Sequence, residues 1–202
     1  MIEKITDNVS RIYFPDVHTC NCYFIHDKRI VIDCGVISVG DALKSLLPIA
    51  PEDVAMVLLT HLHYDHIGCF DVFYSSPFYA SESAINSLES NPGITVYDTE
   101  TIQHIYQKKF KPKPFEIETL KDLGFEIFET PGHAEGSVCF LFDDNGTKIL
   151  FPGDLFFDKD MNVVGRTDLP VSDKKKMEIS LRRMSALSYD ILCPGHGKIT
   201  RL

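Results

Sequence analysis

The segment "LLTHLHYDHIGC", residues 58–69, constrains the fold of this chain more than any other. It overlaps the end of an apolar run, residues 54–60, whose length and composition are typical of a strand buried on both faces. Directly after this run come the side chains of His61, His63, Asp65 and His66. Imidazole and carboxylate groups bind zinc, iron and manganese in proteins. The chain must therefore end a buried strand where metal-binding side chains can converge.

Three more polar residues each follow an apolar, strand-like segment. They are His133 in "TPGHAEGS", Asp154 in "FPGDLFF" and His196 in "CPGHG", and Pro-Gly precedes each of them. Proline sets the direction of the chain, and glycine permits the sharp turn that lets the next side chain project from the strand end. Because chemistry in layered α/β proteins gathers at strand ends, we expect all these side chains to meet at one edge.

The remaining pattern predicts a layered α/β protein with sheets inside and helices outside. A length of 202 residues suits one domain, 1–202. Ser38 or Asp41 is a candidate cap for the first helix. The expected helices cover 38–49, 81–90 and 173–187; the expected strands cover 9–14, 21–27, 29–35, 54–60, 78–81, 125–133 and 189–197, with a hairpin over 137–157 around Asp144-Asn145-Gly146.

Residues 98–118 are polar, interrupted by prolines and locally basic, and we expect them to form a surface insertion beside the site. We hypothesise that Lys109 and Lys111, within the basic stretch Lys108–Lys113, recognise an anionic thiol carrier of the coenzyme A or glutathione kind. The alternative is a solvated loop. His18, His26 and His104 are expected to be ordinary surface or core residues.

The charge and composition exclude several classes of partner. A net charge of −9 argues against broad contact with nucleic acid and against an anionic membrane surface. No apolar run approaches the roughly 18 residues of a membrane span, and no signal peptide is visible. The six cysteines are therefore expected to be reduced, buried thiols of a cytoplasmic protein, and its oligomeric state is open.

Five histidines and two aspartates exceed what one metal ion can bind, whereas two ions can share them if Asp154 bridges. We expect two divalent ions, zinc first, with iron or manganese as alternatives. The histidines must be neutral to bind, so affinity should fall at acid pH. Such a site lowers the pKa of bound water from about 15.7 to about 7 and polarises a carbonyl. Asp65 and Asp154 are the candidate catalytic residues, and no serine elbow of the GxSxG type is present.

Together, "THLHYDHIG", "TPGHAEGS", "FPGDLFF" and "CPGHG" resemble the HxHxDH, His, Asp and His series of the metallo-β-lactamase superfamily. The resemblance spans nearly the whole chain and implies a four-layer αββα sandwich. It also implies two metal positions that share Asp154. One would be held by His61, His63 and His133, and the other by Asp65, His66 and His196. A histidine at position 63 argues against the diiron flavoprotein branch.

The segment "GRTDLP", residues 165–170, resembles the glyoxalase II (hydroxyacylglutathione hydrolase) group of that superfamily. The resemblance implies hydrolysis of a small-molecule acyl-thiol, in which metal-bound hydroxide attacks the thioester carbonyl and a thiolate leaves. Arg166 and Asp168 are expected to pair and to order the loop under the metals; the alternative is a surface ion pair that contributes little stability. We expect no C-terminal helical domain of the kind that full-length glyoxalase II carries. Cys69 stands where that group has glycine, as a small packing residue or as a redox or supporting group.

Other readings of the same motifs remain open. A persulfide (sulfur) dioxygenase with a single iron shares both HxHxDH and a GRTD segment. A lactonase or phosphodiesterase of the same fold also fits a two-metal site. A non-catalytic metal-binding module fits less well, because a structural zinc site is closed by four ligands.

Overall fold

In the computed structural model, which describes residues 1–202, the first part of the chain builds a seven-stranded sheet in the order β1 to β7. Strands β1 to β4 pair antiparallel, and β4 to β7 pair parallel. Parallel strands need long crossovers, and these supply the loops that carry the first metal-binding motif. The strands are β1 (Ile2–Lys4), β2 (Val9–Ile12), β3 (Cys22–Ile25), β4 (Ile30–Ile32), β5 (Met56–Leu58), β6 (Phe78–Ala80) and β7 (Lys113–Pro114).

The rest of the chain builds a five-stranded sheet in the order β12-β11-β10-β9-β8. The expected hairpin joins β9 to β10, and its turn residues Asn145 and Gly146 have φ of 54° and 93°. Both angles are positive, which the favoured two-residue hairpin turns require. The strands are β8 (Phe125–Glu129), β9 (Val138–Asp144), β10 (Thr147–Phe151), β11 (Ile191–Leu192) and β12 (Thr200–Arg201).

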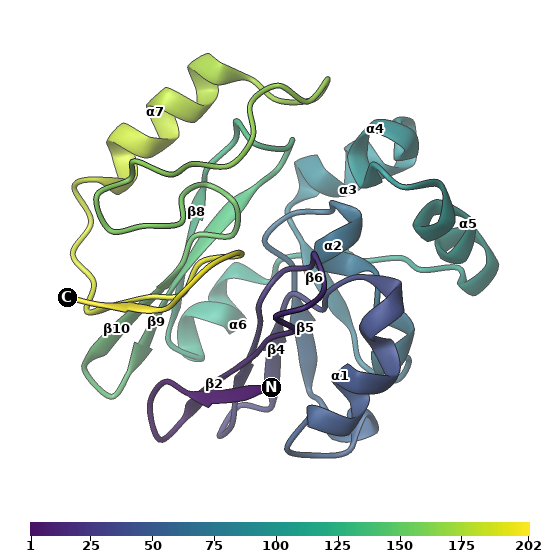
Figure 1. Cartoon of the computed structure of the whole chain (residues 1–202), viewed down its shortest axis with the longest axis horizontal. Helices are drawn as coiled ribbons and strands as arrows, with labels where there is room; N and C mark the ends of the chain where they lie inside the picture. Colours follow the sequence, from purple (N-terminus) through teal and green to yellow (C-terminus); the bar gives the residue numbers. More distant parts are fainter.

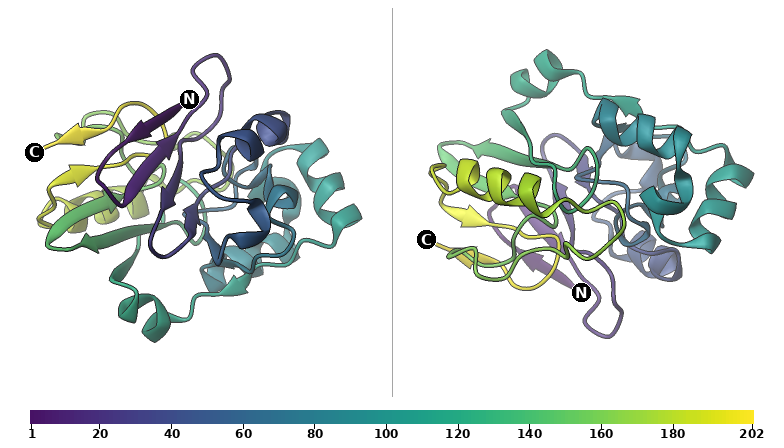
Figure 2. Two further views of the ribbon diagram at one scale, coloured as in Figure 1. Left: turned by 90° about the horizontal axis from the view of Figure 1, so that it is seen from below. Right: turned by 90° about the horizontal axis from the view of Figure 1, so that it is seen from above.

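The two sheets pack face to face, and helices cover both outer faces (Figures 1 and 2). Between the sheets lies a core in which Ile32 and Leu58 of the first sheet meet Phe140 and Phe151 of the second. The predicted four-layer αββα sandwich is therefore confirmed. The helices are α1 (Gly40–Leu46), α2 (Tyr64–Ile67), α3 (Glu82–Ser90), α4 (Pro92–Val96), α5 (Thr99–Lys108), α6 (Ile117–Asp122) and α7 (Lys174–Met184), with 3₁₀ turns η1 (Ile37–Val39), η2 (Pro51–Asp53) and η3 (Phe70–Phe73).

Residues 98–118 are more regular than the expected surface insertion. Asp98 caps α5, because its side chain accepts a hydrogen bond from the Thr101 amide at 2.7 Å. Ile105 is buried in the core, and β7 pairs with β6 as the edge strand of the first sheet. The segment is thus an integral part of the first half, and the cap followed by apolar residues at helical spacing was the available signal.

The expected cap of the first helix is also wrong. Ser38 lies inside η1 and Asp41 inside the first turn of α1, and no side chain caps either element. The preceding 3₁₀ turn leads directly into α1, so the first turn continues an existing helical segment. All six cysteines are free and buried, as expected. No helix combines the length and apolarity needed to cross a membrane.

Candidate metal centre

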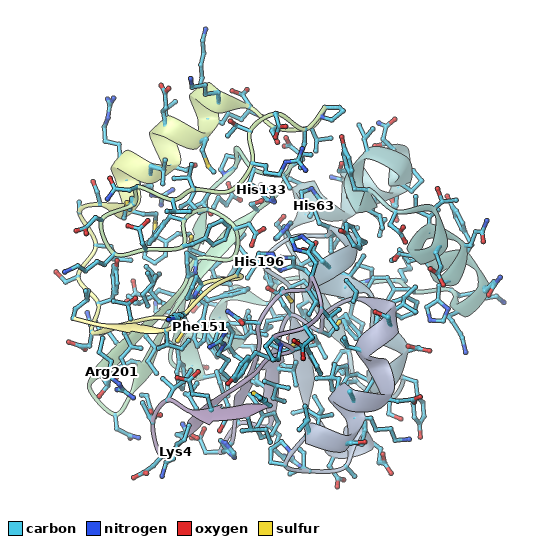
Figure 3. All side chains as sticks on the ribbon, in the orientation of Figure 1. Lys4, His63, His133, Phe151, His196 and Arg201 are labelled. Carbon is cyan, nitrogen blue, oxygen red and sulfur yellow. The ribbon has the colours of Figure 1, made fainter.

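The metal-binding motifs meet where strands of both sheets end, and Figure 3 shows His63, His133 and His196 converging there. The loop after β5 supplies His61 and His63, and α2 supplies the next two side chains of the motif. His133 follows β8, Asp154 follows β10 and His196 follows β11. The structure therefore brings together all the predicted side chains, which form the groups His61/His63/His133, His61/His66/Asp154 and Asp65/His66/His196.

Three imidazoles of the first group face one another at close range. Nδ1 of His63 lies 3.2 Å from Nε2 of His61 and 3.0 Å from Nε2 of His133. Burial holds the pKa of His61 well below its ordinary value and lowers that of His63 to about 3, with neighbouring histidines adding to both shifts. The rings are therefore neutral at physiological pH. Converging lone pairs of neutral imidazoles suit a cation held between them.

Asp154 contacts histidines of both predicted metal positions, the one of His61, His63 and His133 and the one of Asp65, His66 and His196. Its Oδ2 lies 3.5 Å from Nε2 of His133 and 3.4 Å from Nε2 of His196, while its Oδ1 lies 3.3 Å from Nε2 of His66. Nε2 of His196 also lies 3.2 Å from Oδ2 of Asp65. Burial alone would raise the pKa of Asp154, but His66 and His196 hold it well below its usual range. The carboxylate is therefore ionised and lies between the two predicted metal positions.

Three buried polar atoms here have no hydrogen-bond partner: His63 Nε2, His66 Nε2 and Asp154 Oδ1. An unsatisfied buried polar atom costs about 1–3 kcal/mol. His66 Nε2 and Asp154 Oδ1 are neighbours, yet they lack hydrogen-bond geometry toward each other. A cation bound by both atoms would remove this cost, and the set of nitrogen and carboxylate donors fits zinc, iron or manganese.

Hydrogen bonds to residues around the centre hold the Nδ1 atom of three histidine rings and so determine which ring nitrogen points into the centre. The Thr60 hydroxyl lies 2.8 Å from Asp33 and donates its only proton there, so it accepts from His61 Nδ1 at 3.1 Å. His66 Nδ1 donates to the Asp33 carboxylate at 2.8 Å. His133 Nδ1 donates to the main-chain carbonyl of Arg166 at 3.0 Å. Each of these rings therefore turns its Nε2 toward the centre, as outer partners of metal-binding histidines normally ensure.

Asp33 is the most important residue that sequence reasoning missed. It lies just after β4, is buried, and has a φ of 55°, which side chains rarely adopt. Its carboxylate accepts from the Thr60 amide as well as from the Thr60 hydroxyl and His66. The signal was present in "VIDCG", where a carboxylate follows an apolar strand as in the recognised motifs.

A cavity of about 370 Å³ opens above these residues. The ring of His18 stacks on His196, with centroids 5.7 Å apart and planes 13° apart. His18 is exposed, as expected of a surface residue, and the loop between β2 and β3 brings it to the lining of this cavity. Tyr97, also missed, packs its ring 6.0 Å from that of His63. Other lining residues are Tyr64, Phe157, Val164, Arg166 and Leu169.

The model of the metallo-β-lactamase superfamily matches residues 15–196. The chain belongs to this superfamily. A probable metallo-hydrolase of Methanocaldococcus jannaschii is 28% identical over 198 residues, 90% of this chain and 89% of its own. The hydroxyacylglutathione hydrolase GloC of Haemophilus influenzae is 29% identical over 194 residues, 90% of this chain and 87% of its own.

Solved structures agree with this assignment. TTHA1623 in a di-iron-bound form has a TM-score of 0.62 and 26% identity, and the match covers 85% of this chain and 83% of that one. A Thermotoga maritima protein assigned to the metallo-β-lactamases has a TM-score of 0.67 at 24% identity, over 95% and 94% of the two chains, which supports the fold alone. Superfamily membership and the His/Asp cluster together support a metal-dependent hydrolase that uses divalent ions.

The predicted pairing of Arg166 with Asp168 is present in this metallo-β-lactamase-superfamily chain. Two contacts of 2.9 Å join the side chains, and both are largely exposed, so the pair is an exposed ion pair. The main chain of Arg166 supports the centre instead, through its bond from His133. Cys69 is buried and donates to the Val36 carbonyl at 2.7 Å, which makes it a packing residue.

The structure does not bring Lys109 and Lys111 to this cavity; they line two other hollows. Tyr97 ends α4 beside the metal centre, and α5 then leads the chain away. At about 1.5 Å per residue, the ten residues of α5 span about 15 Å. The basic stretch therefore lies at the far end of α5 from the superfamily's metal site (Figures 1 and 3).

Two glycines let the main chain approach the centre closely. A Cβ atom on Gly195 would collide with the Asp154 carboxylate, and one on Gly165 would collide with the Asp154 carbonyl oxygen. Gly195 belongs to the Pro-Gly-His motif, whereas Gly165 begins "GRTDLP". In this chain the "GRTDLP" segment therefore packs its main chain directly against Asp154.

Proposed function

We propose that the protein is a binuclear hydrolase that cleaves thioesters of the glyoxalase II type, with zinc as its metal. The observation that carries the proposal is the contact of one ionised carboxylate, Asp154, with histidines of both groups. The likeness to hydroxyacylglutathione hydrolase over nine-tenths of the chain supports the thioester as substrate. The donor set accepts iron and manganese too, and one similar structure is di-iron-bound.

In this proposal, each of the two sets of three side chains named below would hold one ion, and Asp154 would contribute to both. When bound, the ions would supply Lewis acidity and a water molecule with a pKa near 7. Asp65 is ionised, because His66 and His196 outweigh the effect of burial and lower its pKa. Its carboxylate would therefore accept a hydrogen bond from the attacking water and orient it. His61, His63 and His133 would hold one ion, and Asp65, His66 and His196 the other.

The cavity above the centre suits an acyl group that carries an anionic portion. Phe157, Val164 and Leu169 form an apolar wall that excludes water from the acyl chain. Arg166 lines the same cavity, and because its pair with Asp168 is largely exposed, an anionic substrate can compete with Asp168 for its guanidinium. In the reaction, the carbonyl carbon gains a bond to the oxygen of water and loses its bond to sulfur, which gives a carboxylic acid and a thiol.

The test combines metal analysis with a substrate panel. Protein purified without added metal is analysed for its elements, and kcat/KM is measured for a hydroxyacyl-glutathione thioester, acetyl-coenzyme A, a lactone and an aryl phosphodiester. We expect two metal equivalents and the highest kcat/KM for a thioester. A single iron with thiol-dependent oxygen consumption would establish the dioxygenase instead. A higher kcat/KM for the lactone or the phosphodiester would agree with the two-metal centre but would contradict the thioester as substrate.

A further inference from the structure

A second hollow, of about 680 Å³, lies at the C-terminal end of α5 and shares no residue with the metal cavity. We call it the Lys hollow. It is bordered by four lysines and by aromatic residues of η3, β6 and the segment after α5. Its volume is within the range of about 300–1,000 Å³ that small-molecule sites occupy. The lining residues used below are Phe70, Tyr74, Phe78, Phe110 and the lysines Lys108, Lys109, Lys111 and Lys113.

The four lysines form an uncompensated patch of positive charge. None of them lies within 4 Å of a carboxylate, although the chain carries a net charge of −9. One carboxylate, that of Asp71, lines the Lys hollow, and it is paired with His104 at 3.1 Å. Four like charges around one concave surface repel one another unless an anion is bound between them.

Ordinary structural roles account for only part of this patch. A cation in the last turn of a helix compensates the helix dipole, and Lys108 lies there. A lysine on an edge strand discourages aggregation, and Lys113 lies on the edge strand β7. Neither role explains Lys111. Lys109 adopts a left-handed conformation, with φ of 55°, at a position where glycine is preferred. The chain thus keeps a lysine there at a conformational cost.

Aromatic rings provide the apolar part of the Lys hollow. Phe110 is half-buried and packs on the buried rings of Phe70 and Phe78, whose centroids lie 4.4 Å and 5.1 Å from its own. Tyr74 is 78% exposed on the same surface. Aromatic faces stack with planar bases, and lysine ammonium groups bind phosphates as point charges. Rings beside unpaired lysines therefore favour a ligand that combines a planar group with several phosphate charges.

We propose that the Lys hollow binds a nucleoside diphosphate group, with its phosphates on Lys109 and Lys111 and its base against Tyr74 and Phe110. This group occurs in free nucleotides and at the nucleotide end of coenzyme A. The site goes beyond the proposed hydrolase function and does not depend on it, because the two cavities share no residue.

The experiment is calorimetric titration of the metal-loaded protein with ADP, coenzyme A, inorganic pyrophosphate and adenosine. We expect ADP to bind more tightly than pyrophosphate or adenosine, because each of those offers half of the interaction. Affinity should fall as salt rises, because the contacts are exposed charges. Coenzyme A binding more tightly than ADP would identify the thiol carrier as the source, and equal or weaker binding would identify a free nucleotide. Both results support the site.

Substitutions test whether ADP binds in the Lys hollow or is only attracted by positive charge on the protein surface. K109Q/K111Q should weaken ADP binding by about tenfold or more, and Y74A should weaken ADP binding but leave pyrophosphate binding unchanged. The matched control is K174Q/K175Q, which removes two exposed, unpaired lysines from α7. An equal loss in both double variants, no loss in either, absence of ADP binding at about 1 mM, or binding of a single-stranded oligonucleotide in preference to ADP would each overturn the proposal.

Discussion

The metal centre and the Lys hollow both gather several titratable side chains of one kind, yet they are built in opposite ways. At the metal centre the histidines are mostly buried, and Asp33, Thr60 and the Arg166 carbonyl orient three of the rings. In the Lys hollow the lysines are exposed, and no carboxylate pairs with them. Buried groups with assigned partners are preorganised, whereas exposed lysines keep their side-chain freedom until a ligand binds.

This contrast implies different responses to substitution. Removing a preorganised buried group leaves its partners unsatisfied, so a single change has a large effect. Removing one exposed lysine leaves its neighbours solvated, so effects are modest and depend on salt. The largest effects are expected at the bridging aspartate and the smallest at exposed side chains beside the metal cavity.

Asp154→Asn is expected to have the largest effect. An amide nitrogen cannot bind a cation, so the variant loses one of the two oxygens that face the histidine groups. We expect the metal content to fall below two equivalents and hydrolysis to fall by at least about 10²-fold. Elemental analysis and steady-state kinetics measure both. The control is Glu178→Gln on the exposed face of α7, and a near-normal rate with two bound metals in Asp154→Asn would contradict the bridging role.

Asp33→Asn tests the hydrogen bonds that hold the metal-binding histidines in place from outside the centre. The variant can no longer accept all the hydrogen bonds from Thr60 and His66, because one of its atoms becomes a donor. Affinity for the ion held by His66 should fall by about 10–100-fold. Competition with a chelator of known affinity measures this loss. Asp71→Asn, a change at a less buried carboxylate paired with His104, serves as the control. Equal metal affinity in wild type and Asp33→Asn would show that Asp33 does not position His66.

Acid pH should weaken metal binding through His196. In the metal-free protein burial opposes protonation of this ring, but Asp154 and Asp65 outweigh it and raise the pKa to about 9. Below pH 9 a proton must leave His196 before a cation binds, so apparent affinity falls as pH falls. The loss approaches tenfold per pH unit for each proton displaced. Calorimetry in buffers of different ionisation enthalpy counts the protons, and metal binding at pH 7 without proton release would contradict this assignment.

Arg166→Ala is expected to have the smallest effect on the centre. The exposed side chain is lost, but the main-chain carbonyl that accepts from His133 remains. We expect unchanged metal content and thermal stability, with any loss confined to KM for an anionic substrate. Elemental analysis, thermal unfolding and kinetics with an uncharged thioester separate these effects. Loss of metal in this variant would show that the Arg166–Asp168 pair orders the loop under the metals.

Much of the fold and centre could be predicted because the information is local. The apolar run 54–60 and the motif after it lie within a dozen residues of each other, so strand and ligands are visible together. The three Pro-Gly motifs likewise mark strand ends, where His133, Asp154 and His196 project. The Asn145-Gly146 turn needs only its own backbone preferences. The spacing of apolar residues and the residue types at turns therefore predict both the layered architecture and the metal-binding residues.

The other features depend on contacts between distant parts of the chain. Asp33 supports the centre because β4 lies beside β5, and His18 covers it because a loop folds back over His196. The basic stretch 108–113 lies away from the metals because Asp98 and buried Ile105 make α5 a helix that leads away from Tyr97. Residue types and spacing specify which groups exist in this chain. Which of them meet depends on sheet pairing and helix packing, since these bring together side chains that no local pattern relates.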